Sequence, residues 1–381
     1  MNGDGGPARG LLRCREPMAV VVSERAGVRA AARAVAPLAE LDATPRRVAV
    51  VRALNVGDLL VAVPALRALR RALPAARITL VGLPWAAEMV RRFPRYLDDL
   101  LPFPGFPGIE EAPFDAGRLI ACLADARERA FDLAIQMHGG GRYSNPFTRM
   151  LGATRTAGFV AAGDASGLDF PFPYVDRHHE VHRYLDLVAF LTGVRGDDRL
   201  EFPLEPADRD EVARCLGPDP EPYLVVHPGS RVASRRWMPE RFAAVAEALA
   251  REEGLDVVVS GGPGEGPLVE HVRRRLRCRT RRVSVDIGLG GLAALLAGAR
   301  IVVSNDTAAA HLADAVGAPS VVIYGSAHVA NWGPLDTSRH RTLFVPMACR
   351  PDHCRPCPFD HRCLAAITPD AVVAAARELL A

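Results

Sequence analysis

Short apolar segments alternate with helical patterns twice along this 381-residue chain, and this alternation constrains the fold more than any other feature. Short apolar runs separated by helices are typical of a parallel, doubly wound α/β sheet. The first series predicts strands over 46–54, 76–84 and 131–138, and helices over 58–73, 86–93 and 115–130. The second predicts strands over 223–230, 254–262, 300–305 and 319–325, and helices over 239–253, 265–277, 307–316 and 369–380.

The pattern weakens between about 165 and 220, where the chain is rich in proline. We therefore expect two α/β domains, 46–205 and 206–381, joined by a crossover. Such a pair places a ligand in the cleft between the domains, beyond the strand ends. Residues 1–45 are rich in Ala, Arg and Gly, and we expect them to form a poorly ordered extension, although 24–41 has helical character.

Every one of the 47 basic residues is arginine, because the chain contains no lysine. Schiff-base enzymes, P-loop ATPases and protein kinases are thereby excluded, since each needs a lysine amine. A phosphate group would have to be held by arginine, whose planar guanidinium binds two oxygens at once.

The net charge of +3 is too small for a typical nucleic-acid-binding protein. The basic run 273–282 is interpreted as a solvated helix end or as a patch for an anionic partner or membrane. The longest apolar runs fall short of the about 20 residues that span a membrane. We expect a soluble, cytoplasmic protein.

The first polar signature is Gly57-Asp58, which follows the first predicted strand. Asp58 either caps the next helix or acts as a base. Pro64 lies inside that predicted helix, at a position where proline is expected to kink or break the helix.

The second signature, 227–242, leaves a strand through a tight turn and brings arginines beside small residues. This pattern is equally consistent with a phosphate cradle and with two surface arginines beside a packing tryptophan. A third, 304–325, begins a helix with Asp306, Thr307 and Ala308, and places His311 on the same face as Thr307. It is interpreted as a second phosphate contact, or as a capping aspartate and a core histidine.

The glycines of 260–267 lack the GxGxxG spacing of a dinucleotide site, so this segment is either a plain loop or a ribose contact through Glu265. The cysteine segment 349–363 has spacing C-x4-C-x2-C-x5-C. Four thiolates could hold structural zinc, with reduced thiols as the alternative and His353 and His361 as substitute ligands. The four cysteines are Cys349, Cys354, Cys357 and Cys363.

Taken in order, these motifs resemble the lipopolysaccharide heptosyltransferases, glycosyltransferase family 9, over about residues 46–380. The matching segments in the N-terminal half are the strand leading to Gly57-Asp58 with "PAL" at 64–66, "FDLAIQMHGGGR" (131–142) and "HEVHRYLDL". Those in the C-terminal half are "HPGS" with "RRW.PERF", "GGPGE" and "NDTAAAHLADAVGAP". The resemblance implies the GT-B architecture, in which two Rossmann-like domains face each other across the active site. It also implies inverting transfer from a nucleotide-diphosphate sugar, typically ADP-heptose, without an obligatory metal.

On this resemblance Asp58 matches the general base, and Arg235 or Arg236 replaces a lysine that meets the diphosphate. Ala308 stands where many members have glycine. The implied acceptor is the lipopolysaccharide inner core at the inner membrane face, or a related glycan. The expected donor-binding residues are His227, Gly229, Ser230, Arg235, Arg236, Trp237, Gly262, Glu265, Asp306, Thr307, Ala308 and His311.

Two other functions fit the same architecture. One is a nucleotide-sugar epimerase or hydrolase, which would act without an acceptor. The other is a non-catalytic protein that binds a nucleotide sugar.

Overall fold

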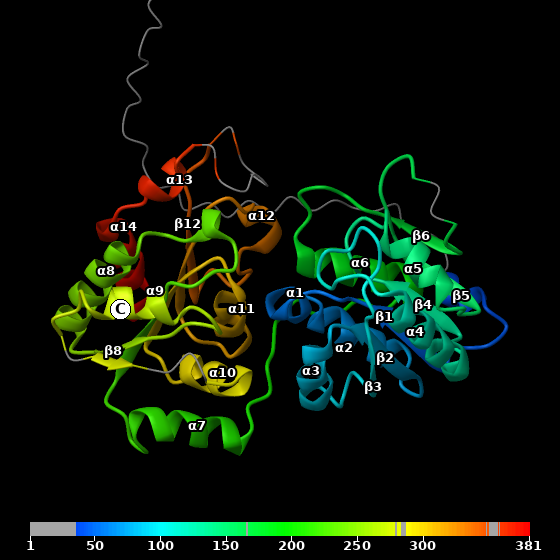
Figure 1. Ribbon diagram of the computed structural model, residues 1–381, viewed down its shortest axis with the longest axis horizontal. Helices are drawn as coiled ribbons and strands as arrows, with labels where there is room; N and C mark the ends of the chain where they lie inside the picture. Colours follow the sequence, from blue (N-terminus) through cyan, green and yellow to red (C-terminus); the bar gives the residue numbers. More distant parts are fainter. Residues whose placement is uncertain are drawn as a thin grey trace, which may run out of the picture.

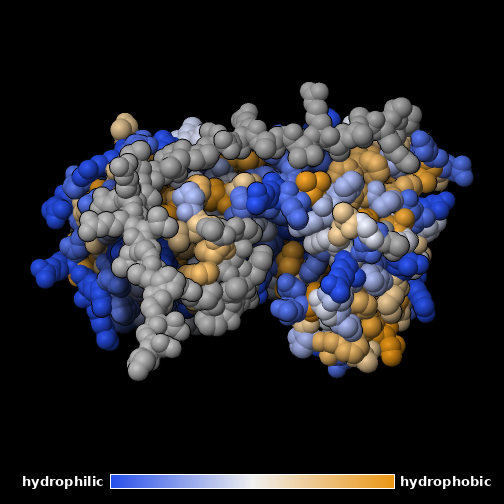
Figure 2. Space-filling model, turned by 90° about the horizontal axis from the view of Figure 1, so that it is seen from above, coloured by the Kyte–Doolittle hydropathy of each residue, from blue (hydrophilic) through white to orange (hydrophobic). Residues whose placement is uncertain are grey.

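The computed structural model describes residues 36–164, 167–278, 280–282, 287–347, 349, 357 and 359–381. Within them the chain forms two α/β domains that lie side by side, each built on a six-stranded parallel sheet (Figure 1). The predicted α/β architecture is confirmed. A notch divides the two lobes when the molecule is seen from above (Figure 2).

The N-terminal sheet has the order β3-β2-β1-β4-β5-β6. Its strands are β1 (Arg47–Val51), β2 (Arg77–Gly82), β3 (Asp99–Pro102), β4 (Leu133–Gln136), β5 (Arg155–Val160) and β6 (Phe170–Pro173). Its helices are η1 (Pro37–Glu40), α1 (Val56–Leu60), α2 (Val63–Ala72), η2 (Pro84–Ala86), α3 (Ala87–Arg92), α4 (Ala116–Arg129), α5 (Ser144–Met150) and α6 (Glu180–Thr192). Central β1 is fully buried from Val48 to Val51, as expected for a strand covered by helices on both faces.

The C-terminal sheet has the order β12-β11-β10-β7-β8-β9. Its strands are β7 (Tyr223–His227), β8 (Asp256–Val259), β9 (Thr280–Arg282), β10 (Ile301–Asn305), β11 (Ser320–Ile323) and β12 (His340–Leu343). The helices of this half are α7 (Pro206–Leu216), η3 (Ala233–Arg235), α8 (Pro239–Glu253), α9 (Gly266–Arg273), α10 (Leu289–Ala297), α11 (Ala308–Ala315), α12 (Val329–Trp332), α13 (Arg362–Ala365) and α14 (Pro369–Leu380). No helix in the described ranges is both long and apolar enough to cross a membrane.

The helix predicted over 58–73 is two helices, so of the two outcomes expected at Pro64, a kink or a break, the structure shows a break. The first helix, α1, begins two residues earlier, at Val56, and ends at Leu60. Pro64 occupies the second position of α2. Proline is tolerated in a first helical turn, whose amides have no intrahelical partner, so the chain restarts a helix here instead of bending one.

The proline-rich stretch 165–220 is more regular than the sequence indicated. It carries β6, α6 and α7, and only 193–205 connects the domains without a helix or strand. Of the expected extension, residues 1–35 lie outside the described residues. The part from 36 to 45 contains η1, whose Leu38 is buried and which packs against α6.

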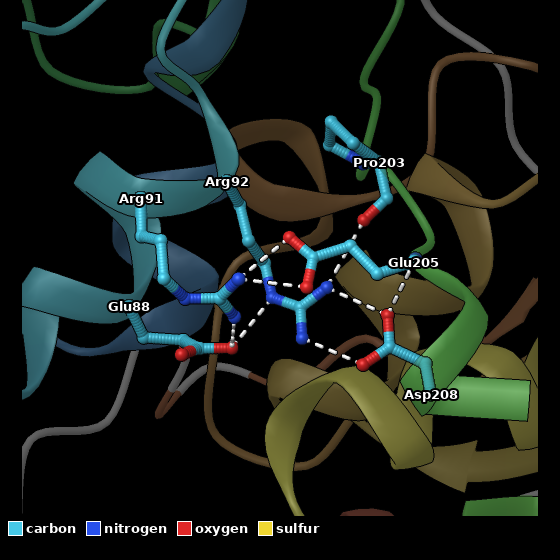
Figure 3. A network of polar contacts seen from close by, with 6 residues as sticks. All are labelled: Glu88, Arg91, Arg92, Pro203, Glu205 and Asp208. Atoms are coloured by element: carbon cyan, nitrogen blue, oxygen red, sulfur yellow. Dashed lines mark hydrogen bonds and ion pairs between the residues drawn. The ribbon is translucent and has the colours of Figure 1, made fainter. Parts of the chain in front are cut away.

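A polar network joins the two halves where the connecting segment reaches α7 (Figure 3). Arg92, on α3, donates from Nη1 and Nη2 to the two carboxylate oxygens of Asp208, on α7, each at 2.7 Å. Both side chains are buried, at 3% and 7% exposure. A Cβ on Gly290 of α10 would lie 1.9 Å from both Arg92 Nη2 and Asp208 Oδ1. The helices α3, α7 and α10 therefore meet at this one ion pair. The domain boundary predicted between residues 205 and 206 stays a prediction, because α7 contacts both halves of the chain.

Candidate active site

Asp58 lies in the first turn of helix α1, which follows β1 at the edge where the strands of the N-terminal sheet have their carboxyl ends. It is the third residue of α1, and the N-cap residue is Asn55, so Asp58 contributes to capping from the N3 position. The two form a capping box, in which Asp58 Oδ2 accepts a hydrogen bond from the Asn55 amide at 3.2 Å. Asp58 is partly exposed, and this hydrogen bond restrains its carboxylate.

The turn that carries Asp58 touches the C-terminal domain. A Cβ on Gly57 would lie 2.7 Å from Cδ2 of His311 and 3.5 Å from Cα of Ala308, which is the first residue of α11. Helices α1 and α11 face each other at the centre of Figure 1. The two motifs predicted on opposite sides of the cleft therefore meet.

A second contact closes the same interface. His179 Nε2 of the N-terminal domain is 2.8 Å from the carbonyl oxygen of Gly333. A small cavity beside it is lined from both domains, by Val61 and His179 on one side and by His311 and Trp332 on the other. The His311 ring packs edge-on against Trp332, with centroids 6.1 Å apart.

At the start of α11, Thr307 occupies the N-cap position and Asp306 is 3% exposed. Asp306 Oδ2 forms an ion pair at 3.1 Å with Nη1 of Arg235, whose side chain is 34% exposed. Small residues occupy the first turn of α11. Side chains of this size permit close approach to backbone amides, and a helix dipole favours an anion at its N-terminus. Arg235 thus lies beside the helix start that the sequence assigned to a phosphate.

The loop after β7 packs on the loop after β8. His227 Nδ1 is 3.0 Å from Ser260 Oγ, and Glu265 Oε2 accepts a hydrogen bond from the Gly262 amide at 2.8 Å. Gly229 has no space for a side chain, because a Cβ there would lie 1.9 Å from the Glu265 carboxylate. Burial lowers the pKa of His227, so its ring is neutral at physiological pH.

Two of the predicted donor-binding residues, Trp237 and Arg236, form hydrogen bonds within the protein. Trp237 is completely buried, its Nε1 donating to Ile367 O at 3.1 Å, so its side chain is not available to a ligand. The packing alternative applies to this residue because the ring stacks edge-on against Phe242 in the core. Arg236 Nε donates to the carbonyl of Ser230 at 2.6 Å and so fixes the shape of the loop.

Sequence reasoning missed four residues around Asp58. Arg52, at the end of β1, is buried beneath the turn, and Tyr184 of α6 lies under its guanidinium. His138 and Glu111 approach from other loops. His138 carried a signal as a polar residue at the carboxyl end of a predicted strand. Arg52 and Tyr184 lie in segments that carry the family resemblance, but nothing in those segments indicated that the two side chains meet. Glu111 comes from a segment with no recognisable motif.

His138 borders the Asp58 turn. Its Nδ1 accepts a hydrogen bond from the Ala53 amide at 3.2 Å, and its Nε2 is 3.8 Å from Glu111 Oε2. Burial lowers the pKa of His138 to about 4, assisted by the Arg52 cation and opposed by Asp58. The ring is therefore neutral at pH 7 and presents an N–H at Nε2.

The cysteine segment gives no support for structural zinc. Cys354 lies outside the described residues, while Cys349, Cys357 and Cys363 line one small cavity. In the part of the chain that the structure describes, no three His, Cys, Asp or Glu side chains are grouped so as to hold a metal ion.

Comparison with known proteins agrees with this geometry. The glycosyltransferase family 9 (heptosyltransferase) model matches residues 121–362. Lipopolysaccharide heptosyltransferase 1 of Pseudomonas aeruginosa is 29% identical over 214 residues, which cover 52% of this chain and 56% of that protein. The curated relatives are matched over only 33% to 56% of their own length.

Solved structures extend the likeness across both domains. The family 9 glycosyltransferase of Veillonella parvula superposes with a TM-score of 0.74 at 24% identity, covering 88% of this chain and 97% of that one. The E. coli heptosyltransferase WaaC, solved with ADP-2-deoxy-2-fluoro heptose, gives 0.64 at 20% identity, covering 87% and 99%. These similarities show a shared GT-B fold, and because the family model matches well over half of the sequence, the chain belongs to glycosyltransferase family 9.

Proposed function

We propose that this protein transfers a heptosyl group from ADP-heptose to a hydroxyl of a glycan acceptor, with inversion at the anomeric carbon. The observation that carries the proposal is the contact of Gly57 with His311 and Ala308. It brings the partly exposed carboxylate of Asp58 next to the helix start expected to hold the donor. Family membership supports the reaction class.

In the proposed step, the Asp58 carboxylate takes the proton of the acceptor hydroxyl. The acceptor oxygen forms a bond to the anomeric carbon while the bond from that carbon to the diphosphate oxygen breaks. ADP leaves with the electron pair of that bond.

The leaving diphosphate is proposed to lie against the first turn of α11 and Arg235. The Arg235 side chain is exposed enough to turn from Asp306 toward a phosphate oxygen. Asp306 would then accept a hydrogen bond from a hydroxyl of the sugar. These groups can stabilise the developing charge without an obligatory metal. Glu265, beside Gly229 and His227, is suited to a ribose hydroxyl.

The acceptor is proposed to be a lipopolysaccharide core or a related glycan, used in the cytoplasm at the inner membrane face. Four large apolar side chains of the N-terminal domain are exposed, namely Phe114, Ile120, Tyr143 and Met150. They are suited to peripheral contact with a lipid surface. Flotation with vesicles of anionic phospholipid, compared with a variant carrying serine at these four positions, tests this part alone.

The central test compares wild type with Asp58→Asn, using ADP-heptose, deacylated core oligosaccharide and a coupled measurement of ADP release. The asparagine oxygen can still accept from the Asn55 amide, so the turn should persist. We expect kcat to fall about 10²- to 10⁴-fold, with the donor Kd within about twofold of wild type. A variant that keeps most of its rate would show that Asp58 has only a capping role. ADP release that is equally fast without acceptor would indicate a hydrolase instead.

A further inference from the structure

Arg52 is 1% exposed and lies directly beneath the turn that carries Asp58. Its Nε donates to the backbone carbonyl of Asp58 at 2.8 Å, and Nη2 donates to the same oxygen. Its Nη1 donates to the carbonyl of Met137, just beyond β4. One guanidinium therefore ties the turn to the neighbouring strand of the sheet while leaving the Asp58 carboxylate uninvolved.

The guanidinium is itself held from the other side by α6. Its central carbon lies 4.2 Å from the ring centroid of Tyr184, whose hydroxyl donates to the buried carboxylate of Glu180. A cation over an aromatic face is stabilised by the ring quadrupole. Arg52 is thus fixed between α6 and the turn.

Arg52 has no carboxylate partner among the residues that the structure describes. Burying a cation without a counter-charge is costly, and an apolar side chain would fill the same space at lower cost. Packing therefore does not explain the arginine. What an apolar residue could not do is bond two carbonyl oxygens that belong to different segments.

We propose that Arg52 is a positioning residue for the transfer reaction, and that it aims the Asp58 carboxylate at the acceptor hydroxyl by fixing the backbone of its turn. The inference rests on the proposed function for the chemistry of Asp58, and on the contacts above for the geometry. A lysine ammonium is a point charge on a flexible stem and cannot replace the fork, so even Arg52→Lys should release the turn.

The test compares Arg52→Lys with Arg67→Lys. Arg67 is a largely buried arginine of α2 that bonds to Asp197, Arg199 and Glu201 and does not touch the turn. For each variant we would measure kcat and KM with ADP-heptose and deacylated core oligosaccharide. Donor Kd would come from calorimetry, and amide hydrogen exchange would be followed over residues 53–60.

For Arg52→Lys we expect kcat to fall about 10- to 100-fold, since small misplacement of a reacting group has effects of this size. The donor Kd should stay within about twofold, and exchange over 53–60 should accelerate. Arg67→Lys should match wild type in kcat and in exchange over this segment. This combination supports the inference, whereas unchanged kcat in Arg52→Lys, or equal losses in both variants, overturns it.

Failure of the proposed function would be recognised separately. If the wild type transfers sugar to no acceptor, the proposed function fails and the exchange comparison alone decides about Arg52. Faster exchange over 53–60 in Arg52→Lys only would support its hold on the turn. Equal exchange in the two variants would overturn it.

Discussion

His311 of the C-terminal domain packs so closely on Gly57 of the N-terminal domain that a β-carbon at position 57 would stand 2.7 Å from the imidazole Cδ2. Real β-carbons do not approach ring atoms this closely. His311 is 8% exposed and rests against Trp332, so it has little room to move away. The absence of a side chain at 57 is therefore a condition for the two domains to meet beside Asp58.

Gly57→Ala should consequently weaken the domain contact. Overpacking of this kind costs about 1–3 kcal/mol. If the closed arrangement is the one that binds donor, this corresponds to a loss in ADP-heptose affinity of about 5- to 150-fold, measurable by calorimetry. Gly117→Ala is the matched control, because the nearest atom to a Cβ there, Asp115 Oδ1, lies 3.4 Å away. Wild-type affinity in both variants would show that the contact does not govern donor binding.

The second prediction concerns the ion pair of Arg235 with Asp306 at the start of α11. Arg235→Gln removes the cation beside the start of α11, and charge-assisted hydrogen bonds contribute about 1.5–3 kcal/mol. We expect ADP to bind about 10- to 100-fold more weakly, with adenosine affinity unchanged, because only ADP carries the diphosphate. A parallel loss for adenosine would mean that the substitution had deformed the site, and would contradict a phosphate contact.

The ion pair of Arg92 with Asp208 should dominate the stability of the domain junction. Removing one partner of a buried pair leaves an uncompensated charge, at a cost of about 3–5 kcal/mol. Arg92→Met should lower the free energy of urea unfolding by about this amount at pH 7. Arg92→Met combined with Asp208→Leu should recover much of the loss, because neither charge then remains. If the single variant is as stable as the double variant, the pair makes no net contribution.

This contribution should also depend on pH. The hydrogen bonds from Arg92 lower the pKa of Asp208, while burial opposes the shift. The stabilisation is therefore complete above the ordinary carboxyl pKa of about 4 and is lost as the pH falls further, through the lowered value. The difference in unfolding free energy between wild type and Asp208→Asn should shrink below pH 4.

His179 should make stability fall on acidification in a higher range. Burial lowers its pKa to about 4, although the bond to Gly333 opposes the shift. The unfolded chain takes up its proton near pH 6.5 and the folded chain only near pH 4, so stability falls as the pH drops between these values. The loss from pH 7 to pH 5 is about 2 kcal/mol for one such histidine. In urea titrations His179→Gln should show a smaller loss, and the exposed His271→Gln should behave as wild type.

Element prediction from the sequence succeeded where local signals were strong. The helix bounds 239–253 and 369–380 agree with α8 and α14, because each begins with a proline at its first position. Strands such as β7 and β10 were recognised by their continuous apolar runs. The sequence analysis did not predict α10, since its Leu, Gly and Ala residues carry little amphipathic contrast.

Only some of the residues of the candidate site could be predicted from the sequence. Asp58 follows β1 of one sheet, and Asp306 and His311 follow β10 of the other; a parallel sheet places such positions at the edge formed by the carboxyl ends of its strands. Arg52 and Tyr184 could not be assigned roles, because their contact joins segments about 130 residues apart and depends on how α6 packs. The burial of Trp237 likewise depends on Ile367, far along the chain.

The junction of Arg92, Asp208 and Gly290 also limits how sequences of this kind can diverge. Neutral replacement of Arg92 alone leaves Asp208 as a buried, unpaired charge, and neutral replacement of Asp208 alone leaves Arg92 with only the partly exposed Glu88 as an ion-pair partner. A side chain at position 290 would collide with both Arg92 and Asp208. Viable descendants must therefore alter the charged pair together, or keep it while their surfaces drift. We expect these three positions to change as a block when homologous sequences are aligned.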